Sequence, residues 1–347
     1  MQLNRTPRLE GLPAEGDGPP GQRPALPPIL DAVEVLARHG REPEPQALVR
    51  GMLHRGSKMV IGGGSKSYKT WALTDLAVSV ASGLPWWGLE TSPARVLYIN
   101  FEIQDYFFSR RLGEVTAAKL APIRPATLDV WGLRGHAAPL EALAPEIIAR
   151  TRDGGYGLLI IDPIYKCQGG RDDNRAGDVA LLLNEVERLT TVTGAAAVFG
   201  AHFSKGNQAA KQAMDRIGGS GVYARDPDSI LTLTPHEEPY CYTAEATLRN
   251  FPHMEPFVVR WDFPLFRPAA ALDAGRLRRA GRPESVPADE VLELLDEGGM
   301  SAGQWFQAVA DAHGIRSRQT FYAIVSRLLA AGRILKEGRG SYSRARP

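Results

Sequence analysis

Apolar residues follow two different spacings along the chain. Residues 96–101, 158–161 and 195–199 form short runs that stay apolar at successive positions. Such runs are typical of strands buried on both faces, as in a parallel sheet covered by helices. Between the last two runs, apolar residues recur at three- and four-residue steps. This spacing predicts a helix over residues 178–193 with Asp178 as its cap.

A second helix is predicted directly after Thr70. Its apolar positions have the same helical spacing and predict a single buried stripe along Leu73, Leu76, Ala77, Val80 and Ala81. Gly83 and Gly194 follow the two helices and are predicted to end them, because glycine readily takes the left-handed conformation that closes a helix.

The alternation of strands and helices predicts one α/β domain over residues 29–266. A short helix is expected over residues 29–38, and the core is expected to start near Gln46. Residues 1–28 are rich in Pro and Gly and predict a disordered arm. An antiparallel edge is expected on the mainly parallel sheet, from segments with short connections at residues 229–234, 243–248 and 257–261.

The last part of the chain has a pattern of its own. Residues 267–286 are rich in Arg, Gly, Pro and Ala and predict a linker to a second unit at residues 287–347. Ser301 and Gln304 have the spacing of a capping box at a helix start. Three helices and then a hairpin, which together outline a winged helix-turn-helix domain, are predicted at residues 288–295, 301–312, 317–329, 334–337 and 341–343.

Composition adds a few exclusions. The 347 residues carry a formal net charge of +2, so any contact with nucleic acid has to come from local patches. Cys167 and Cys241 give neither a disulfide framework nor a zinc cluster. The chain has no apolar run of membrane-spanning length and no apolar core of a signal peptide, which predicts a cytoplasmic protein without a membrane partner.

A glycine-rich turn precedes the predicted helix after Thr70. Backbone N–H groups in such a loop, together with the helix N-terminus, favour the phosphates of a nucleotide. We therefore predict ATP and Mg²⁺ as cofactors, with Lys69 on the β- and γ-phosphates and the Thr70 hydroxyl on the metal ion. The predicted cofactor-binding segment is Gly62, Gly63, Gly64, Ser65, Lys66, Ser67, Tyr68, Lys69, Thr70 and Trp71.

This segment departs from the P-loop pattern G-x-x-x-x-G-K-[ST] at one position. Its first glycine is Gly63, but Tyr68 occupies the place of the second. A tyrosine resists positive φ, so the loop must follow another path or accept strain. The alternative interpretation is an ordinary glycine turn with Lys69 in solvent.

Three polar residues follow apolar segments, namely Glu102 after residues 96–101, Asp162 after residues 158–161 and His202 after residues 195–201. Ligands of parallel α/β sheets bind at the carboxyl ends of the strands. Asp162 is therefore predicted to hold Mg²⁺, Glu102 to activate the attacking water, and His202 to sense the γ-phosphate. Each also has a plainer interpretation: a turn residue, a solvated strand end and a structural histidine.

Residues 62–71, 98–102, 158–163 and 201–205 resemble, in this order, the motifs of RecA/DnaB-type ATPases. The resemblance is closest to the RepA-like hexameric helicases of plasmids, phages and integrated elements, and it covers about residues 46–266. It implies a RecA-like P-loop core and makes Tyr68 a subfamily trait. It also implies catalytic or metal-binding roles for Lys69, Thr70, Glu102, Asp162 and His202.

The resemblance further implies a homo-hexamer with single-stranded DNA in a central channel. Two polar loops, residues 166–177 and 204–219, would line this channel. The predicted DNA contacts in the second loop are Lys205, Lys211 and Arg216, because a cationic groove is needed to follow a nucleic-acid backbone. The alternative is two solvated surface loops.

A ring of this type also implies an arginine that reaches the nucleotide of the neighbouring subunit and stabilises the transition state. Arg249 matches the late basic motif of the family. Arg225 is the second candidate, although an ion pair with Asp226 or Asp228 would account for it equally well.

The predicted C-terminal unit is moderately basic, with twelve basic and eight acidic residues over 276–347. Arg318 on the predicted recognition helix and Arg339 at the wing tip are the expected contacts to duplex DNA. The alternative is a domain that docks a protein, such as a replication protein, or that stabilises the oligomer.

The function predicted from the sequence is an ATP-dependent DNA helicase or translocase in replication of a mobile element. One alternative is a RecA/RadA-like ATPase in repair, recombination or defence. Another is a non-catalytic DNA-binding regulator whose nucleotide site is degenerate at Tyr68.

Overall fold

The structure is a computed structural model that describes residues 28–203, 216–217, 221–278, 288–296, 298–315, 317–338 and 340–345. It divides into two compact units, residues 1–45 and 46–347. The arm predicted at residues 1–28 falls almost entirely outside the described residues. In the first unit, α1 (Ala32–His39) confirms the short predicted helix, and the Asp31 carboxylate caps it by accepting from the N–H groups of Val33 and Glu34.

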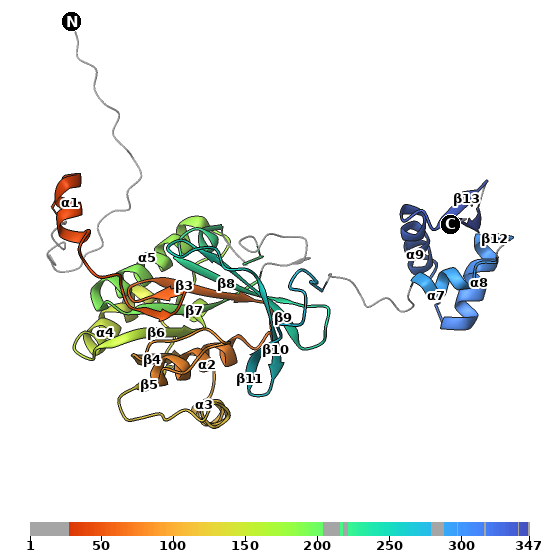
Figure 1. Ribbon diagram of the computed structural model, residues 1–347. Coiled ribbons are helices and arrows are strands. Elements are labelled where there is room, and N and C mark those ends of the chain that lie inside the picture. Colours follow the sequence, from red (N-terminus) through yellow and green to blue (C-terminus); the bar gives the residue numbers. More distant parts are fainter. Residues whose placement is uncertain are drawn as a thin grey trace, which may run out of the picture. The chain divides into compact units, whose positions relative to one another are not determined.

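A sheet of nine strands, counted over the described residues, lies at the centre of the second unit (Figure 1). The strand order is β11-β10-β9-β8-β3-β7-β6-β4-β5. Neighbours from β8 to β5 are parallel, and β8 to β11 pair antiparallel; the sequence predicted this antiparallel edge for β8, β9 and β10 but did not predict β11. The strands are β3 (Lys58–Gly63), β4 (Arg95–Asn100), β5 (Leu128–Gly132), β6 (Tyr156–Asp162), β7 (Ala196–His202), β8 (Ser229–Pro235), β9 (Cys241–Leu248), β10 (Phe257–Asp262) and β11 (Leu265–Pro268).

Shorter elements complete the core. It starts at Gln46, as predicted, with an antiparallel pair of β1 (Ala47–Val49) and β2 (Leu53–His54). Short 3-10 helices follow β6 and precede β8, namely η1 (Ile164–Cys167) and η3 (Gly221–Ala224).

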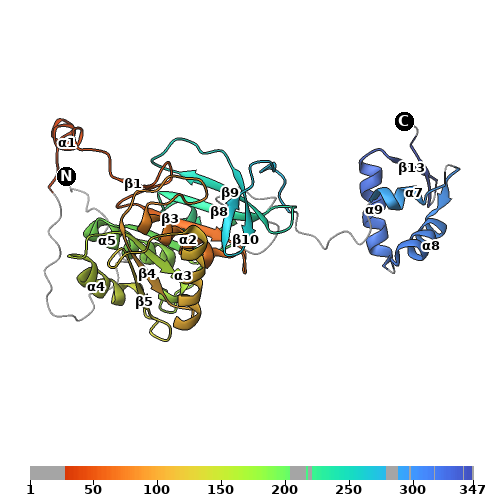
Figure 2. The ribbon, with the colours of Figure 1, turned by 60° about the horizontal axis from the view of Figure 1, so that its bottom comes forward.

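Helices cover both faces of the sheet (Figures 1 and 2). On β6, the side chains of Leu158 and Ile160 join one hydrophobic cluster, and those of Leu159 and Ile161 join the other. This alternation explains why the predicted strands are apolar at successive positions. The helices are α2 (Lys69–Ser82) and α3 (Asp105–Lys119) on one face, and α4 (Leu140–Thr151) and α5 (Ala176–Thr193) on the other. Among the described residues, no helix has the length and apolarity needed to span a bilayer.

The prediction of one buried stripe on α2 is wrong. All ten residues from Ala72 to Ala81 are buried, including the polar Thr74, Asp75 and Ser79. The polar positions are satisfied inside the core, where Lys119 of α3 pairs with Asp75 over 2.7 Å. The helix is therefore enclosed on all sides, and it ends at Gly83 with φ +71°, as predicted.

Asp178 does not cap α5, contrary to the prediction. The helix begins at Ala176 after Arg175, so Asp178 lies inside its first turn. There its carboxylate accepts a 3.0 Å hydrogen bond from the N–H of Asp172 and orders the preceding loop. Gly194 ends the helix in the left-handed conformation, as predicted.

The core continues beyond the boundary predicted at residue 266. β11 pairs with β10, Leu277 forms a bridge with His236, and the Arg278 N–H donates to Pro235 O over 2.8 Å. The predicted linker at residues 267–286 is therefore wrong in its first part, since these residues belong to the sheet edge. Residues 279–287 lie outside the described part of the chain.

The elements from residue 288 onward have a hydrophobic cluster of their own, centred on Trp305 and Phe321. The indole N–H of Trp305 donates to Val291 O over 2.9 Å, and the predicted capping box of Ser301 and Gln304 is present. The helices and strands are α7 (Ala288–Glu293), β12 (Met300–Ser301), α8 (Ala302–His313), α9 (Arg318–Ala330), β13 (Ile334–Glu337) and β14 (Ser341–Arg344).

Candidate nucleotide-binding site

The register of the parallel sheet brings four strand ends to one edge. Gly63 at the end of β3 is paired with His202 at the end of β7. Asn100 at the end of β4 is paired with Asp162 at the end of β6. Because parallel strands finish at the same edge, the loop after β3 lies beside the side chains of Glu102, Asp162 and His202.

The loop between β3 and α2 is stabilised by contacts within itself. Ser67 is buried, and its hydroxyl donates to Gly64 O over 2.7 Å. A Cβ on Gly63 would come within 2.6 Å of Ser67 Oγ, so this close approach requires glycine. The first turn of α2 contains no acidic residue, so the positive end of the helix is left available to an anion.

Tyr68 adopts the glycine-like conformation that the P-loop pattern demands. Its φ and ψ are 59° and 22°, in the left-handed region, so the loop keeps its path and accepts strain. This conformation costs an L-residue roughly 1–2 kcal/mol. The ring stacks on that of Trp261, with a centroid distance of 4.3 Å and an interplanar angle of 12°.

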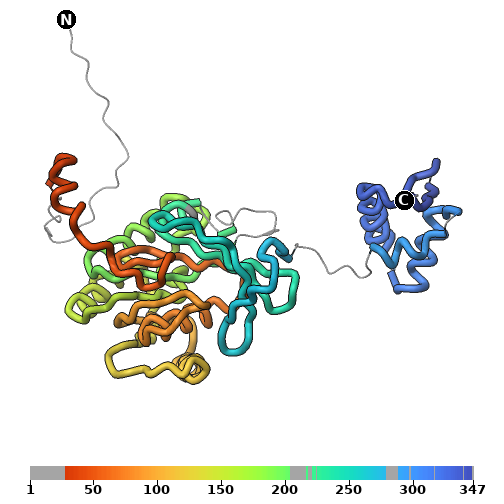
Figure 3. Tube along the Cα trace, in the orientation of Figure 1, coloured from red at the N-terminus to blue at the C-terminus, as the bar shows by residue number. Residues whose placement is uncertain are grey.

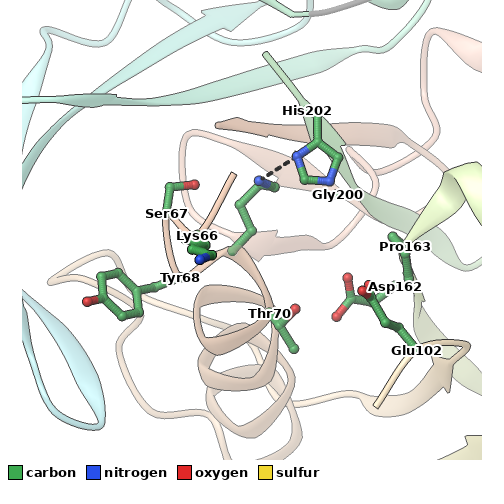
Figure 4. Close-up of a pocket in the computed structure, with 10 residues that line it drawn as sticks. Lys66, Ser67, Tyr68, Thr70, Glu102, Asp162, Pro163, Gly200 and His202 are labelled. Carbon is green, nitrogen blue, oxygen red and sulfur yellow. Dashed lines mark hydrogen bonds between the residues drawn. The ribbon is translucent and has the colours of Figure 1, made fainter. Parts of the chain in front are cut away.

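Lys69 bends back onto its own loop. Its ammonium donates to Gly63 O at 3.0 Å and to Gly64 O at 2.8 Å, and it lies 3.4 Å from His202 Nδ1 (Figure 4). Burial lowers the pKa of Lys69 to about 8. The negative charges of Asp162 and Glu102 act in the opposite direction and raise this pKa, but by less than burial lowers it. Burial and the Lys69 charge lower the pKa of His202. A neutral imidazole that accepts at Nδ1 carries its proton on Nε2, which is then a donor.

Asp162 is almost completely buried, with 6% of its surface exposed. Burial raises the pKa of its carboxyl, and hydrogen bonds from Tyr98 and Thr70 oppose that rise. The Tyr98 hydroxyl donates to Asp162 Oδ2 over 2.7 Å from the adjacent strand β4. No role was predicted for Tyr98 from the sequence, although a phenol inside a buried strand signals a hydrogen-bonded partner.

Glu102 is exposed and faces the cavity from a turn after β4 (Figure 4). Asn100 organises this turn: its Oδ1 accepts from the N–H groups of Ile103 at 2.9 Å and Glu102 at 3.3 Å, and its Nδ2 donates to Ile103 O at 2.6 Å. Asn100 is also a residue that the sequence analysis missed. The available signal was a lone amide at the end of an apolar run.

These side chains enclose a cavity of about 190 Å³, lined by Lys66, Ser67, Tyr68, Lys69, Thr70, Glu102, Asp162, Pro163, Gly200 and His202. A hydroxyl and a carboxylate facing one space are the hard oxygen donors that Mg²⁺ takes from proteins when phosphates supply the other ligands. Within the described residues, no group of three or more His, Cys, Asp or Glu side chains is placed to hold a metal. The donor set therefore fits a metal that is shared with phosphate, with Thr70 and Asp162 as its protein ligands.

Part of the predicted cofactor segment lies outside the cavity wall. Gly63 and Gly64 contribute the carbonyls that hold Lys69, and Gly62 and Ser65 do not line the cavity. The ring of Trp71 packs against Trp261 and Phe263 at centroid distances of 5.6 and 5.4 Å, so it is part of a hydrophobic contact instead.

Arg249 and Arg225 do not line this cavity. The Arg249 guanidinium donates to Arg225 O over 2.6 Å and lies 3.6 Å from an Asp228 carboxylate oxygen. The ion pair with Asp228, which the sequence suggested for Arg225, is thus made by Arg249. The Arg249 side chain is nevertheless about half exposed.

Arg216 is not placed to contact DNA, contrary to the prediction. It is buried, with its guanidinium 2.6 Å from a Glu245 carboxylate oxygen and 3.2 Å from Thr234 Oγ1. Lys205, Lys211 and Arg339 lie outside the described residues. Arg318 is exposed at the start of α9, where it approaches the ring of Phe306.

Replacing Asp162 with Asn is expected to raise the thermal unfolding midpoint of the ligand-free protein at pH 7. The folded state raises the pKa of this carboxyl, so its ionised form destabilises the fold at neutral pH. That penalty disappears as the pH falls through the folded-state pKa, and the difference between the two proteins should shrink accordingly. Scanning calorimetry between pH 4 and 8 measures the difference in unfolding midpoint between Asp162→Asn and the wild type. Asp153→Asn, at an exposed site, is the control. A midpoint that falls at pH 7 contradicts the prediction.

Comparison with known proteins places this geometry in a family. No curated protein matches the chain. A family model described as an AAA domain matches residues 23–208, which is more than half of the chain. The match includes the loop before α2, Glu102, Asp162 and His202, and the family indicates a nucleotide-dependent ATPase that usually also binds Mg²⁺. The chain therefore belongs to the AAA-domain family of P-loop ATPases.

Proposed function

We propose that this protein is an ATP-driven DNA helicase or translocase of RepA-like type, which serves the replication of a plasmid, phage or integrated element. The observation that carries the proposal is the convergence of Lys69, Thr70, Glu102, Asp162 and His202 around one cavity. Phosphoryl transfer needs cations, a metal ligand and a group that positions water, all within reach of the same phosphate.

Each of these residues has a role in the proposed reaction. The Lys69 ammonium binds phosphate oxygens, and Thr70 and Asp162 hold the ion that neutralises charge on the phosphates. Glu102, held on the turn that Asn100 organises, accepts the proton of the attacking water. His202 donates from Nε2 toward the terminal phosphate and reports its loss to the segment after β7.

A homo-oligomeric ring is part of the proposal. The cavity is smaller than the roughly 300–1,000 Å³ that usually encloses a whole ligand, so it suits the phosphates, and in the proposed ring a neighbouring subunit would complete the site. Arg249 lies away from the cavity of its own chain and is half exposed, as an arginine acting on a neighbour would be. A hexamer around single-stranded DNA is the arrangement that we propose.

The C-terminal elements support a second contact with nucleic acid. A winged helix consists of three helices and a small sheet, and this part of the chain has α7, α8 and α9 with a sheet in the order β12-β14-β13. Arg318 and Tyr322 are exposed on α9, the helix that would enter the major groove. This surface is consistent with binding to duplex DNA and also with binding to a replication protein. A DNA-repair ATPase that does not unwind remains the alternative function.

Replacing Lys69 with Ala should abolish ATP hydrolysis. Glu102→Gln should keep nucleotide binding but lower kcat at least ~100-fold, because it removes the general base. Steady-state hydrolysis and equilibrium binding separate the two effects. Glu146→Gln, on the surface of α4, is the control that should leave the rate unchanged. Wild-type rates in Lys69→Ala would remove the enzymatic function.

Nucleotide affinity should fall as the pH rises above 8. Lys69 loses its proton near that pH, and only the ammonium attracts phosphate. The expected loss is up to about tenfold per pH unit between pH 8 and 9.5, above the range in which the phosphate itself titrates. Binding isotherms test this, and Lys69→Ala should show weak affinity without the pH step. If Lys69→Ala showed the same fall in affinity above pH 8, the pH dependence would have to come from another titrating group.

Mixing two inactive variants should restore activity if Arg249 acts on a neighbouring subunit. Lys69→Ala subunits keep the arginine, and Arg249→Ala subunits keep the nucleotide site, so mixed oligomers contain some complete sites. Hydrolysis should recover in the mixture to a sizeable fraction of the wild-type rate. A mixture that stays as inactive as its components argues against an arginine supplied in trans.

A further inference from the structure

Tyr68 departs from the P-loop pattern, and its side chain has a specific partner. The backbone holds φ at +59°, and the ring points away from the cavity (Figure 4). It stacks almost parallel on Trp261 of β10, with centroids 4.3 Å apart. The rings of Tyr242 and Phe266 contact the Tyr68 ring edge-on, each at a centroid distance of 6.3 Å.

The partner belongs to the antiparallel edge of the sheet. β10 and β11 form a hairpin in which Trp261 is paired with Phe266. The tube in Figure 3 shows this hairpin beside the start of α2. Trp71 also packs on Trp261 and on Phe263 near the turn of the hairpin. The two phosphate-site residues Lys69 and Thr70 are thus flanked on both sides by aromatic residues that contact one hairpin.

We propose that Trp261 is a positioning residue for the nucleotide site and acts through Tyr68. A glycine at position 68 would take the left-handed conformation at no steric cost, whereas a tyrosine must be held there by an outside contact. The stack on Trp261 provides that contact. The phosphate-binding loop of this chain therefore depends on a hairpin about two hundred residues later in the sequence. This inference rests on the proposed nucleotide binding.

The dependence implies a route of communication. A displacement of the β10–β11 hairpin removes the support of Tyr68, so the loop can leave the conformation in which Lys69 and Thr70 face the cavity. Conversely, a triphosphate that holds the loop in place also holds the Tyr68 ring, on which Trp261 stacks. The fluorescence of Trp261 is expected to change when nucleotide binds.

The test combines Trp261→Leu, Tyr68→Gly and the double variant, with MgATP binding measured by calorimetric titration. Trp261→Leu should weaken binding at least about tenfold. Tyr68→Gly should stay within about threefold of the wild type, because glycine needs no support. The double variant should bind like Tyr68→Gly. Trp131→Leu, on β5 at the opposite edge of the sheet from the β10–β11 hairpin, is the matched control and should bind like the wild type.

Rescue by glycine separates positioning from general destabilisation. A double variant as weak as Trp261→Leu overturns the proposal, because the loss would then not pass through position 68. Wild-type affinity in Trp261→Leu overturns it as well.

A second readout needs no nucleotide. Amide hydrogen exchange over residues 64–69 should be faster in Trp261→Leu and should return to the slower rate in the double variant, while exchange over β6 stays unchanged and shows that the core is folded. Equal exchange in the wild type and Trp261→Leu overturns the proposal. If the wild type binds no ATP, the proposed function fails, and this exchange measurement still decides the role of Trp261.

Discussion

The parallel pairing of β3, β7, β6 and β4 is the constraint on which the site depends. Main-chain hydrogen bonds fix Gly63 opposite His202 and Asn100 opposite Asp162. Because side chains alternate between the faces of a strand, a slip of one residue would exchange the environments of Ile161 and Asp162. Such a slip would also move Gly63 away from His202 and Asn100 away from Asp162. The register of the sheet thus specifies which side chains meet at the cavity.

The same burial leaves the site electrostatically unbalanced. The core opposes the charges of both Lys69 and Asp162, lowering the pKa of the first and raising that of the second. The ammonium is held by neutral partners, the carbonyls of its own loop and His202 Nδ1, and the carboxylate by two hydroxyl groups. A triphosphate with a divalent cation brings the opposite charge to each. In the proposed complex, part of the binding free energy would therefore come from relieving an unfavourable ligand-free state, which is a common property of functional sites.

The sequence was sufficient for the strands β4 and β6 to β10, for the existence of α1, α2 and α5, and for Lys69, Thr70, Glu102, Asp162 and His202 at the cavity, but it did not predict α3, α4, β5 or β11. Apolar runs located β4, β6 and β7, and the residue after each run or at its end proved to face the cavity. It was not sufficient for contacts that depend on tertiary packing. The burial of Arg216 against Glu245 and of Asp75 against Lys119 depends on which elements become neighbours, and a local pattern does not contain that information. The boundary near residue 266 was misplaced for a related reason, because β11 is a short edge strand whose polar surroundings resemble a linker.

Tyr68 shows where local reasoning reaches its limit. The pattern predicted either a changed path or strain, and it could not choose, because the choice depends on Trp261. An aromatic pair contributes about 0.5–1.5 kcal/mol beyond its buried area. A left-handed L-residue costs roughly 1–2 kcal/mol. Since these magnitudes are comparable, neither the strain nor the stack dominates, and the loop conformation follows the position of the hairpin. A glycine would have made the loop independent of that hairpin, so the tyrosine gives a distant edge of the sheet influence over phosphate binding.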